Sequence, residues 1–190
     1  MIIGYVRYGS LKGLANMRLN WPLLVFFAFI MEASTYYLTV WFPDIFPRNQ
    51  WLVSSLQYIL LFIFISKNTQ ETSIAILGMG MLLNFFAISF NLGRMPVSEI
   101  IYDIPQFANT LEKINSGRLP EYFIMQGGES FWFFGDVLPI PFMGIGIASI
   151  GDIFLAVGIF ILIQKYMISA RPKRAIILSQ RVKTFLARGK

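Results

Sequence analysis

The chain has 190 residues, of which 56% are hydrophobic and 14% charged, and its formal net charge is +6. Soluble domains are roughly 25% charged, so this composition predicts a single-domain integral membrane protein spanning residues 1–190. Cysteine and histidine are both absent, which excludes disulfides, thiolate metal sites and the commonest general base near neutral pH. The basic excess fits the cytoplasmic face of a membrane protein, and we expect no nucleic-acid partner.

Four apolar segments predict an all-α fold with four transmembrane helices. The first, 22–40, lies between Trp21 and Trp41, residues that favour the two interfaces of a bilayer. About 20 helical residues at a rise of about 1.5 Å each cross the hydrocarbon core. The other three predicted spans are 51–65, 73–90 and 142–165.

The distribution of Lys and Arg predicts the orientation, because cytoplasmic loops carry an excess of these residues. If both termini are cytoplasmic, twelve of the 16 basic residues lie on the cytoplasmic side. The four on the outer side are Arg48, Arg94, Lys113 and Arg118. We therefore expect a multi-pass protein of a cytoplasmic membrane with both termini inside.

The outer connection, 92–140, is too long to be a simple turn between two helices. Its apolar residues recur at steps of three and four, which predicts an amphipathic helix that begins near Pro105 and ends before Gly117. These apolar residues are Ile100, Ile104, Phe107, Leu111 and Ile114. The aromatic segment 131–141 is interrupted by glycine and proline, so we expect either a re-entrant segment buried in protein or an interfacial loop anchored by Trp132.

Two basic segments have the pattern of helices that lie on a membrane surface. One is a short helix that starts near Ser10. The other is the tail 171–190, where Leu178, Val182 and Phe185 recur at helical spacing among lysines and arginines. We expect this tail to bind anionic lipids, and a solvated charged tail is the alternative.

Each predicted span carries one strongly polar residue near its middle: Glu32, Gln57, Asn84 and Asp152. A charge at the bilayer centre costs at least about 2.5 kcal/mol, so each acid requires an explanation. One hypothesis is a ligand or ion site in which the two acids share a proton or hold a cation. The alternative is that these side chains bond helix to helix.

The fourth predicted span also carries a face of small residues that favours close helix packing, made of Gly144, Ala148, Gly151 and Gly158. At the outer boundary, Arg94 and Asp136 form a hypothetical polar site, in which Arg94 either binds a phosphate or pairs with an acid. No nucleotide-binding loop or metal-ligand cluster is present, and we expect no catalytic residue, metal or cofactor.

Four motifs occur in order along the chain: GSLK at 9–12, NLGRMPVS at 91–98, GDVLPIP at 135–141 and SIGD at 149–152. Together they resemble a family of small bacterial membrane proteins known only as a domain of unknown function. The resemblance implies a bacterial cytoplasmic membrane and carries no known reaction.

Three functions follow as hypotheses. The first is a small non-catalytic subunit that packs within a larger membrane assembly or against copies of itself. The second is a binding or transport protein for a small solute, ion or lipid that uses Glu32, Asp152 and Arg94. The third is a lipid-modifying enzyme at the outer interface, with Arg94 on a phosphate and Asp136 as general acid or base.

Overall fold

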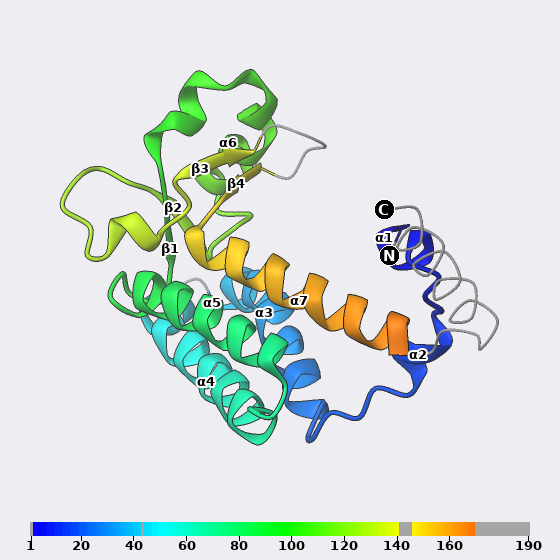
Figure 1. The fold of residues 1–190 in the computed structure, drawn as a ribbon. Coiled ribbons are helices and arrows are strands. Elements are labelled where there is room, and N and C mark those ends of the chain that lie inside the picture. Colours follow the sequence, from blue (N-terminus) through cyan, green and yellow to red (C-terminus); the bar gives the residue numbers. More distant parts are fainter. Residues whose placement is uncertain (1, 43, 141–145, 170–190) are drawn as a thin grey trace, which may run out of the picture.

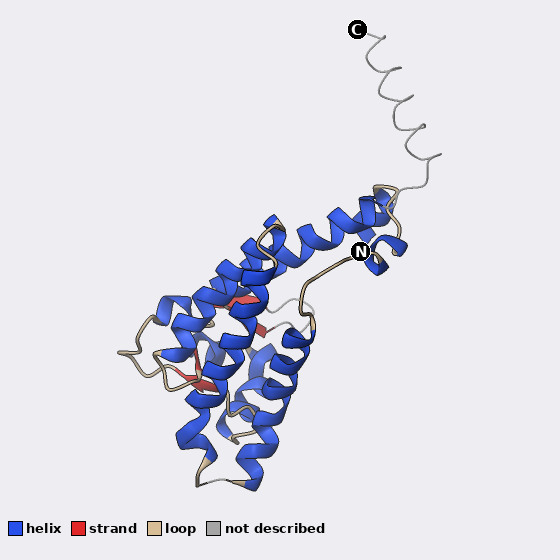
Figure 2. Cartoon of the chain, turned by 90° about the horizontal axis from the view of Figure 1, so that it is seen from below, coloured by secondary structure: helices blue, strands red, loops and turns tan. Residues whose placement is uncertain are grey.

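The computed structural model describes residues 2–42, 44–140 and 146–169, and this part of the chain is mostly helical (Figures 1 and 2). In this described part of the chain, four helices are long and apolar enough to cross a membrane. The prediction of an all-α protein with four candidate transmembrane helices is therefore confirmed. The four are α3 (Leu23–Trp41), α4 (Phe46–Lys67), α5 (Thr72–Ser89) and α7 (Ile150–Ser169).

The four helices pack as two pairs. Helix α5 lies along α7, α3 lies along α4, and contacts between α4 and α5 join the pairs (Figure 1). Phe64, Ile74, Leu77 and Leu162 form the apolar core between α4, α5 and α7. Many apolar side chains of α3 are exposed on the surface of the chain, where a membrane protein contacts lipid.

Helix α7 begins at Ile150, so the predicted start near residue 142 is wrong. Residues Gly146–Ala148 instead form strand β4, which pairs antiparallel with β3 (Leu138–Ile140). The helix start is fixed by a capping box between Ser149 and Asp152. The backbone N–H of Asp152 donates to Ser149 Oγ at 2.9 Å, and the backbone N–H of Ser149 donates to Asp152 Oδ2 at 3.0 Å.

The later helix start also changes the predicted small-residue face. Ala148 lies in β4 and not on the helix, and Gly144 lies outside the described residues. Gly151 and Gly158 do lie on α7 and face α5, where an added Cβ would clash with Asn84 and Leu77 respectively. The close packing of small residues therefore starts at the first turn of α7.

The described residues between α5 and α7 (90–140 and 146–149) form a small folded unit at one end of the helices, hereafter the cap (Figure 1). Strand β1 (Met95–Val97) pairs parallel with β2 (Tyr122–Ile124). Val97, Ile101, Phe107 and Ile114 form its buried core. The cap therefore has its own apolar core.

The predicted amphipathic helix of the cap, from Pro105 to before Gly117, corresponds to η2 (Pro105–Phe107) followed directly by α6 (Ala108–Asn115), and the apolar pattern before it forms a separate piece, η1 (Glu99–Asp103). The break falls at Ile104, whose backbone is extended (φ −114°, ψ 105°), because a residue before proline avoids the helical region. Gly117 ends this region with a positive φ of 72°, as its predicted capping role requires.

The aromatic segment before β3 belongs to the cap and is mainly irregular. It contains one short 3₁₀ turn, η3 (Trp132–Phe134), and then leads into β3. Phe131 packs against Phe86 and Phe90 at the end of α5, with ring centroids 5.5 and 4.8 Å away. The segment thus anchors the cap to α5.

The far end of α7 lies beside α1 (Ile2–Val6) and α2 (Lys12–Ala15) (Figure 1). The backbone N–H of Ser10 donates to the carbonyl of Met167 at 2.9 Å. The helix expected from Ser10 is reduced to the single turn of α2. The tail 171–190 lies outside the described residues, so its binding to anionic lipids stays a prediction.

Candidate functional site

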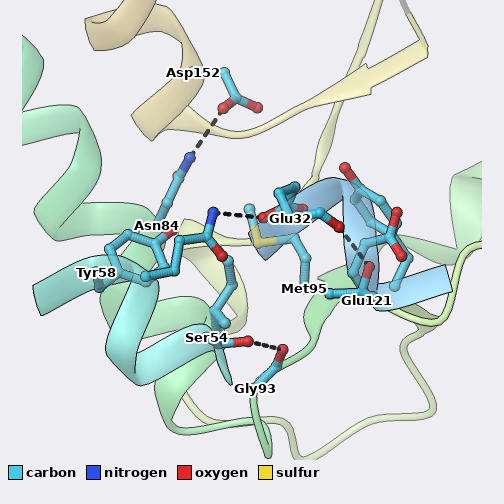
Figure 3. A pocket seen from close by; sticks show the side chains of 12 residues that line it. Glu32, Ser54, Tyr58, Asn84, Gly93, Met95, Glu121 and Asp152 are labelled. Carbon is cyan, nitrogen blue, oxygen red and sulfur yellow. Dashed lines mark hydrogen bonds between the residues drawn. The ribbon is translucent and has the colours of Figure 1, made fainter. Parts of the chain in front are cut away.

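The four polar residues singled out in the predicted spans line one cavity of about 180 Å³, hereafter the helix cavity (Figure 3). Its walls are α3, α4, α5, the first turn of α7 and the cap. The four residues are Glu32, Gln57, Asn84 and Asp152. The structure therefore brings them together, while their role toward a ligand stays a prediction.

Glu32 is held from the neighbouring helix. The side-chain amide of Gln57 on α4 donates to Glu32 Oε2, and the hydroxyl of Thr35 donates to the backbone carbonyl of Glu32 at 2.8 Å. These bonds leave Oε1 of the carboxylate without a bond among the described residues. Glu32 is thus positioned by α4 and retains an acceptor atom.

Asp152 was predicted near the middle of its helix, but it lies in the first turn of α7. Its Oδ1 accepts a hydrogen bond from the Asn84 amide at 2.9 Å, and its Oδ2 accepts from the backbone of Ser149. The hydroxyl of Ser149 in turn donates to Asn84 Oδ1 at 2.8 Å. Since both oxygens are bonded, Asp152 mainly fixes the start of α7 against α5, and its negative charge suits a helix N-terminus.

The cap contributes a third carboxylate, Glu121, which the sequence analysis did not single out. It follows Pro120 directly before β2, so only the folding of the cap onto the helices brings it to the cavity. Burial raises the pKa of Glu121, and the nearby guanidinium of Arg94 opposes this effect. The only sequence signal was an acid placed directly before the apolar strand YFI.

The helix cavity is acidic. Glu32, Glu121 and Asp152 line it, and no Lys or Arg is among its lining residues in the described chain. The same described residues contain no group of three His, Cys, Asp or Glu side chains close enough to hold one metal ion. The carboxylates are therefore spread around the walls, and they produce a negative potential that attracts cations.

Arg94 has a different place from the one predicted. Its guanidinium donates to the carbonyl oxygens of Pro120 and Tyr122 and lies 5.4 Å from the ring centroid of Phe123. Burial lowers the pKa of this half-buried side chain. Arg94 therefore binds the segment that leads into β2. Among the described residues no hydrogen bond or ion pair joins it to Asp136, and a role of the two residues in an outer polar site stays a prediction.

Asp136 lies inside the cap and is only 7% exposed. Its Oδ1 has no hydrogen-bond partner among the described residues. Burial, followed by the charge of Asp152, raises the pKa of Asp136 from 3.8 to about 8. This carboxyl group therefore holds its proton in the folded protein at neutral pH.

The raised pKa of Asp136 predicts a pH-dependent stability. Between its two pKa values the folded chain retains the proton that the unfolded chain loses, so stability is greatest at low pH and falls as the pH rises toward 8. From about pH 5.5 to about pH 7, we expect a loss on the order of 2 kcal/mol, since one pH unit corresponds to about 1.4 kcal/mol.

Unfolding in detergent at the two pH values measures this loss. Asp136→Asn should remove this loss and leave only the pH dependence that other groups such as Glu121 contribute, whereas Asp103→Asn, at an exposed carboxylate of the same cap, should leave the profile unchanged. If wild type and Asp136→Asn lose stability equally, Asp136 is not the group responsible.

Comparison with known protein families shows the family to which the chain belongs. A family model described as a family of unknown function, DUF5317, matches residues 16–164. The chain belongs to this family. The expected membership of an uncharacterised family is thus confirmed, and the DUF5317 match includes every residue that lines the helix cavity. No curated protein and no solved structure matches the chain.

Proposed function

We propose that the chain is a multi-pass membrane protein that binds a small organic cation in the helix cavity. The observation that carries this proposal is the set of three carboxylates, Glu32, Glu121 and Asp152, on the walls of one cavity that has no basic lining residue in the described chain. A cation that enters would compensate charges that are costly to keep unpaired near the bilayer interior.

The volume of the helix cavity and the placement of its carboxylates on different walls favour an organic cation over a bare metal ion. The cavity volume is about 180 Å³, and a cavity of about 150 Å³ accommodates a molecule as large as benzene. Glu32 and Glu121 lie on different walls, one on α3 and the other in the cap. An alkylammonium ion fills such a space and donates to one carboxylate while it approaches the second.

The location belongs to the same proposal. Twelve of the 16 Lys and Arg residues fall in the terminal segments and in the connection between the second and third spans, and this excess supports cytoplasmic termini in a bacterial cytoplasmic membrane. Lys67 and Lys165 lie at the helix ends opposite the cap. In this orientation the cap lies on the outer side, and the helix cavity lies directly beneath it. A cation from outside would therefore have only the cap to pass.

The proposal predicts that alkylammonium binding depends on Glu32 and Glu121. Glu32→Gln and Glu121→Gln should each weaken binding of n-butylammonium about tenfold or more, because a hydrogen bond to a charged group contributes about 1.5–3 kcal/mol. Calorimetry on the full chain in nanodiscs measures the Kd. Glu112→Gln, at an exposed carboxylate of α6, is the matched control and should bind like wild type.

Butan-1-ol, the neutral analogue of the same length, should not bind in the helix cavity. Equal binding of n-butylammonium to wild type and to both cavity variants would rule out the proposed site. Tighter binding of Na⁺ or Mg²⁺ than of any alkylammonium would reject an organic cation.

The hypothesis of a non-catalytic subunit stays as a second candidate. It is supported by α3, which packs on one side only and exposes Phe26, Phe27 and Phe29. Either lipid chains or a partner helix can cover this face. Native mass spectrometry of the protein extracted from its own membrane distinguishes the two, because a subunit would carry a stoichiometric protein partner.

A further inference from the structure

The cap contains a second cavity of about 240 Å³ that is partly open to the surface, hereafter the cap cavity. Most of its wall belongs to the apolar core of the cap, including Val97, Ile101, Phe107 and Ile114. Asp136, Glu121, Tyr122 and Thr110 contribute the polar groups. It is thus an apolar space with a few polar groups, which is the usual composition of a small-molecule site.

The backbone holds Asp136 firmly in the wall of this cavity. Its N–H donates to the carbonyl of Pro96 at 2.9 Å, and its own carbonyl accepts from the N–H of Ser98 at 2.8 Å. Asp136 is therefore bonded through both its N–H and its carbonyl to residues 96–98, at the end of β1. Its carboxyl group cannot leave the cap without breaking these bonds.

The side chain of Asp136, by contrast, is not satisfied by the protein. It is more than nine-tenths buried, and its Oδ1 has no partner among the described residues. A buried polar group without a hydrogen bond costs roughly 1–3 kcal/mol, so such groups usually have a partner. The unpaired carboxyl oxygen belongs to a residue that lines this cavity, so a guest of the cavity would supply the missing partner.

The volume decides between a single water and a larger guest. One water occupies about 30 Å³ in the liquid, and a cavity of about 150 Å³ with apolar walls holds an aromatic molecule. The cap cavity is larger than both and its walls are mainly apolar. A guest that fills it therefore needs an apolar body.

We propose that the cap cavity binds a small neutral molecule that has an apolar body and one oxygen atom, which accepts a hydrogen bond from the carboxyl O–H of Asp136. A neutral guest is favoured over a cation because a buried ion pair loses the hydration of both charges and regains it only with additional hydrogen bonds. This site is separate from the cation site of the helix cavity, although Glu121 and Tyr122 border both spaces.

The protonation state of Asp136 agrees with this role. Its pKa is raised to about 8 by burial and by the charge of Asp152, so it is a hydrogen-bond donor at neutral pH. The other titratable groups that face the cavity are Glu121 and Tyr122, and burial raises the pKa of both. Deprotonation of Asp136 above about pH 8 would remove the donor and weaken the binding of a neutral guest.

The test uses the full chain in detergent with ¹³C-labelled isoleucine methyl groups and two probes of matched shape, benzyl alcohol and benzylammonium. Methyl signals of Ile101 and Ile114, which line the cap cavity, report binding in the cap, and Ile74 in the core between the helices is the control signal. Partition of the probes into the detergent does not produce a saturable shift that is confined to the cap.

Benzyl alcohol should shift the signals of Ile101 and Ile114 with saturation, and benzylammonium should not. Asp136→Ala should raise the Kd about three- to tenfold, the effect of one neutral hydrogen bond. Asp136→Asn, whose amide still donates, should change the Kd by less than about twofold and remove the weakening above pH 8. Thr110→Trp, which fills the cavity from its half-exposed rim, should abolish the shifts.

Two outcomes would overturn the proposal. No saturable shift with benzyl alcohol means that the cap cavity takes no such guest. Binding of benzylammonium that Asp136→Asn abolishes means that the guest is a cation. Glu32→Gln should leave benzyl alcohol binding unchanged, so failure of the cap site and failure of the helix site are distinguishable. Unchanged unfolding temperatures of the variants confirm that the fold is retained.

Discussion

Replacing Gly80 with alanine is expected to lower the free energy of unfolding by about 3 kcal/mol, at the upper end of the usual effect of overpacking. A Cβ at this position would lie 2.5 Å from the carbonyl oxygen of Gly151 and 3.0 Å from the backbone nitrogen of Leu155. Both atoms belong to the backbone of α7, so no side-chain rotation relieves the clash. Helices α5 and α7 would have to move apart.

Gly78 provides a matched control on the same helix. A Cβ there would lie 2.9 Å from Ile65 Cγ2, and its three nearest atoms all belong to this side chain and not to a backbone. Since alanine favours a helix over glycine by about 1 kcal/mol, Gly78→Ala should be neutral or slightly stabilising. Unfolding of both variants by SDS titration gives the comparison. Equal destabilisation would mean that the approach of the α5 and α7 backbones is not what limits stability.

Gly80→Ala should also affect the helix cavity. The bonds of Asn84 to Asp152 and Ser149 cross the contact between α5 and α7, directly beside Gly151. Separation of the helices breaks these bonds and displaces the wall that Asn84 and Asp152 form. Gly80→Ala should therefore also weaken n-butylammonium binding, whereas Gly78→Ala should not.

Replacing Arg94 with alanine is expected to cost about 3 kcal/mol and to release the cap segment that leads into β2. The guanidinium donates to two carbonyl oxygens, those of Pro120 and Tyr122, and a hydrogen bond to a charged group contributes about 1.5–3 kcal/mol. Alanine leaves both half-buried carbonyls without their donor. Arg94→Lys should recover only part of this loss, because one ammonium cannot reproduce the planar fork of the guanidinium.

Limited trypsin digestion measures the release. Cleavage after Arg118, an exposed residue close to Pro120, should be faster in Arg94→Ala than in wild type. Lys113→Ala, which removes an exposed basic residue of the same cap, should leave this rate unchanged. If Arg94→Ala leaves the cap protected but loses anionic lipid binding, the phosphate role considered for Arg94 would be correct instead.

The sequence by itself determined the membrane-spanning helices. Runs of about 20 apolar residues admit one structure in a bilayer, because only a helix satisfies every backbone group without water. The polar residues Glu32 and Gln57 were predicted at similar depths, and they do meet. The start of α7 was also present in the sequence, since SIGD is a capping box, but the continuous apolar run concealed it.

The tertiary structure alone decided the composition of the two cavities. Glu121 reaches the helix cavity only because β2 pairs in parallel with β1, a contact between distant segments that no local pattern encodes. The same holds for Asp136, which looks like an exposed loop acid in the sequence, but whose backbone bonds to Pro96 and Ser98 and whose side chain the cap core surrounds. Helices in a bilayer follow from local hydrophobicity, whereas burial of a loop carboxylate depends on long-range packing, and the sequence specifies that packing only through the whole fold.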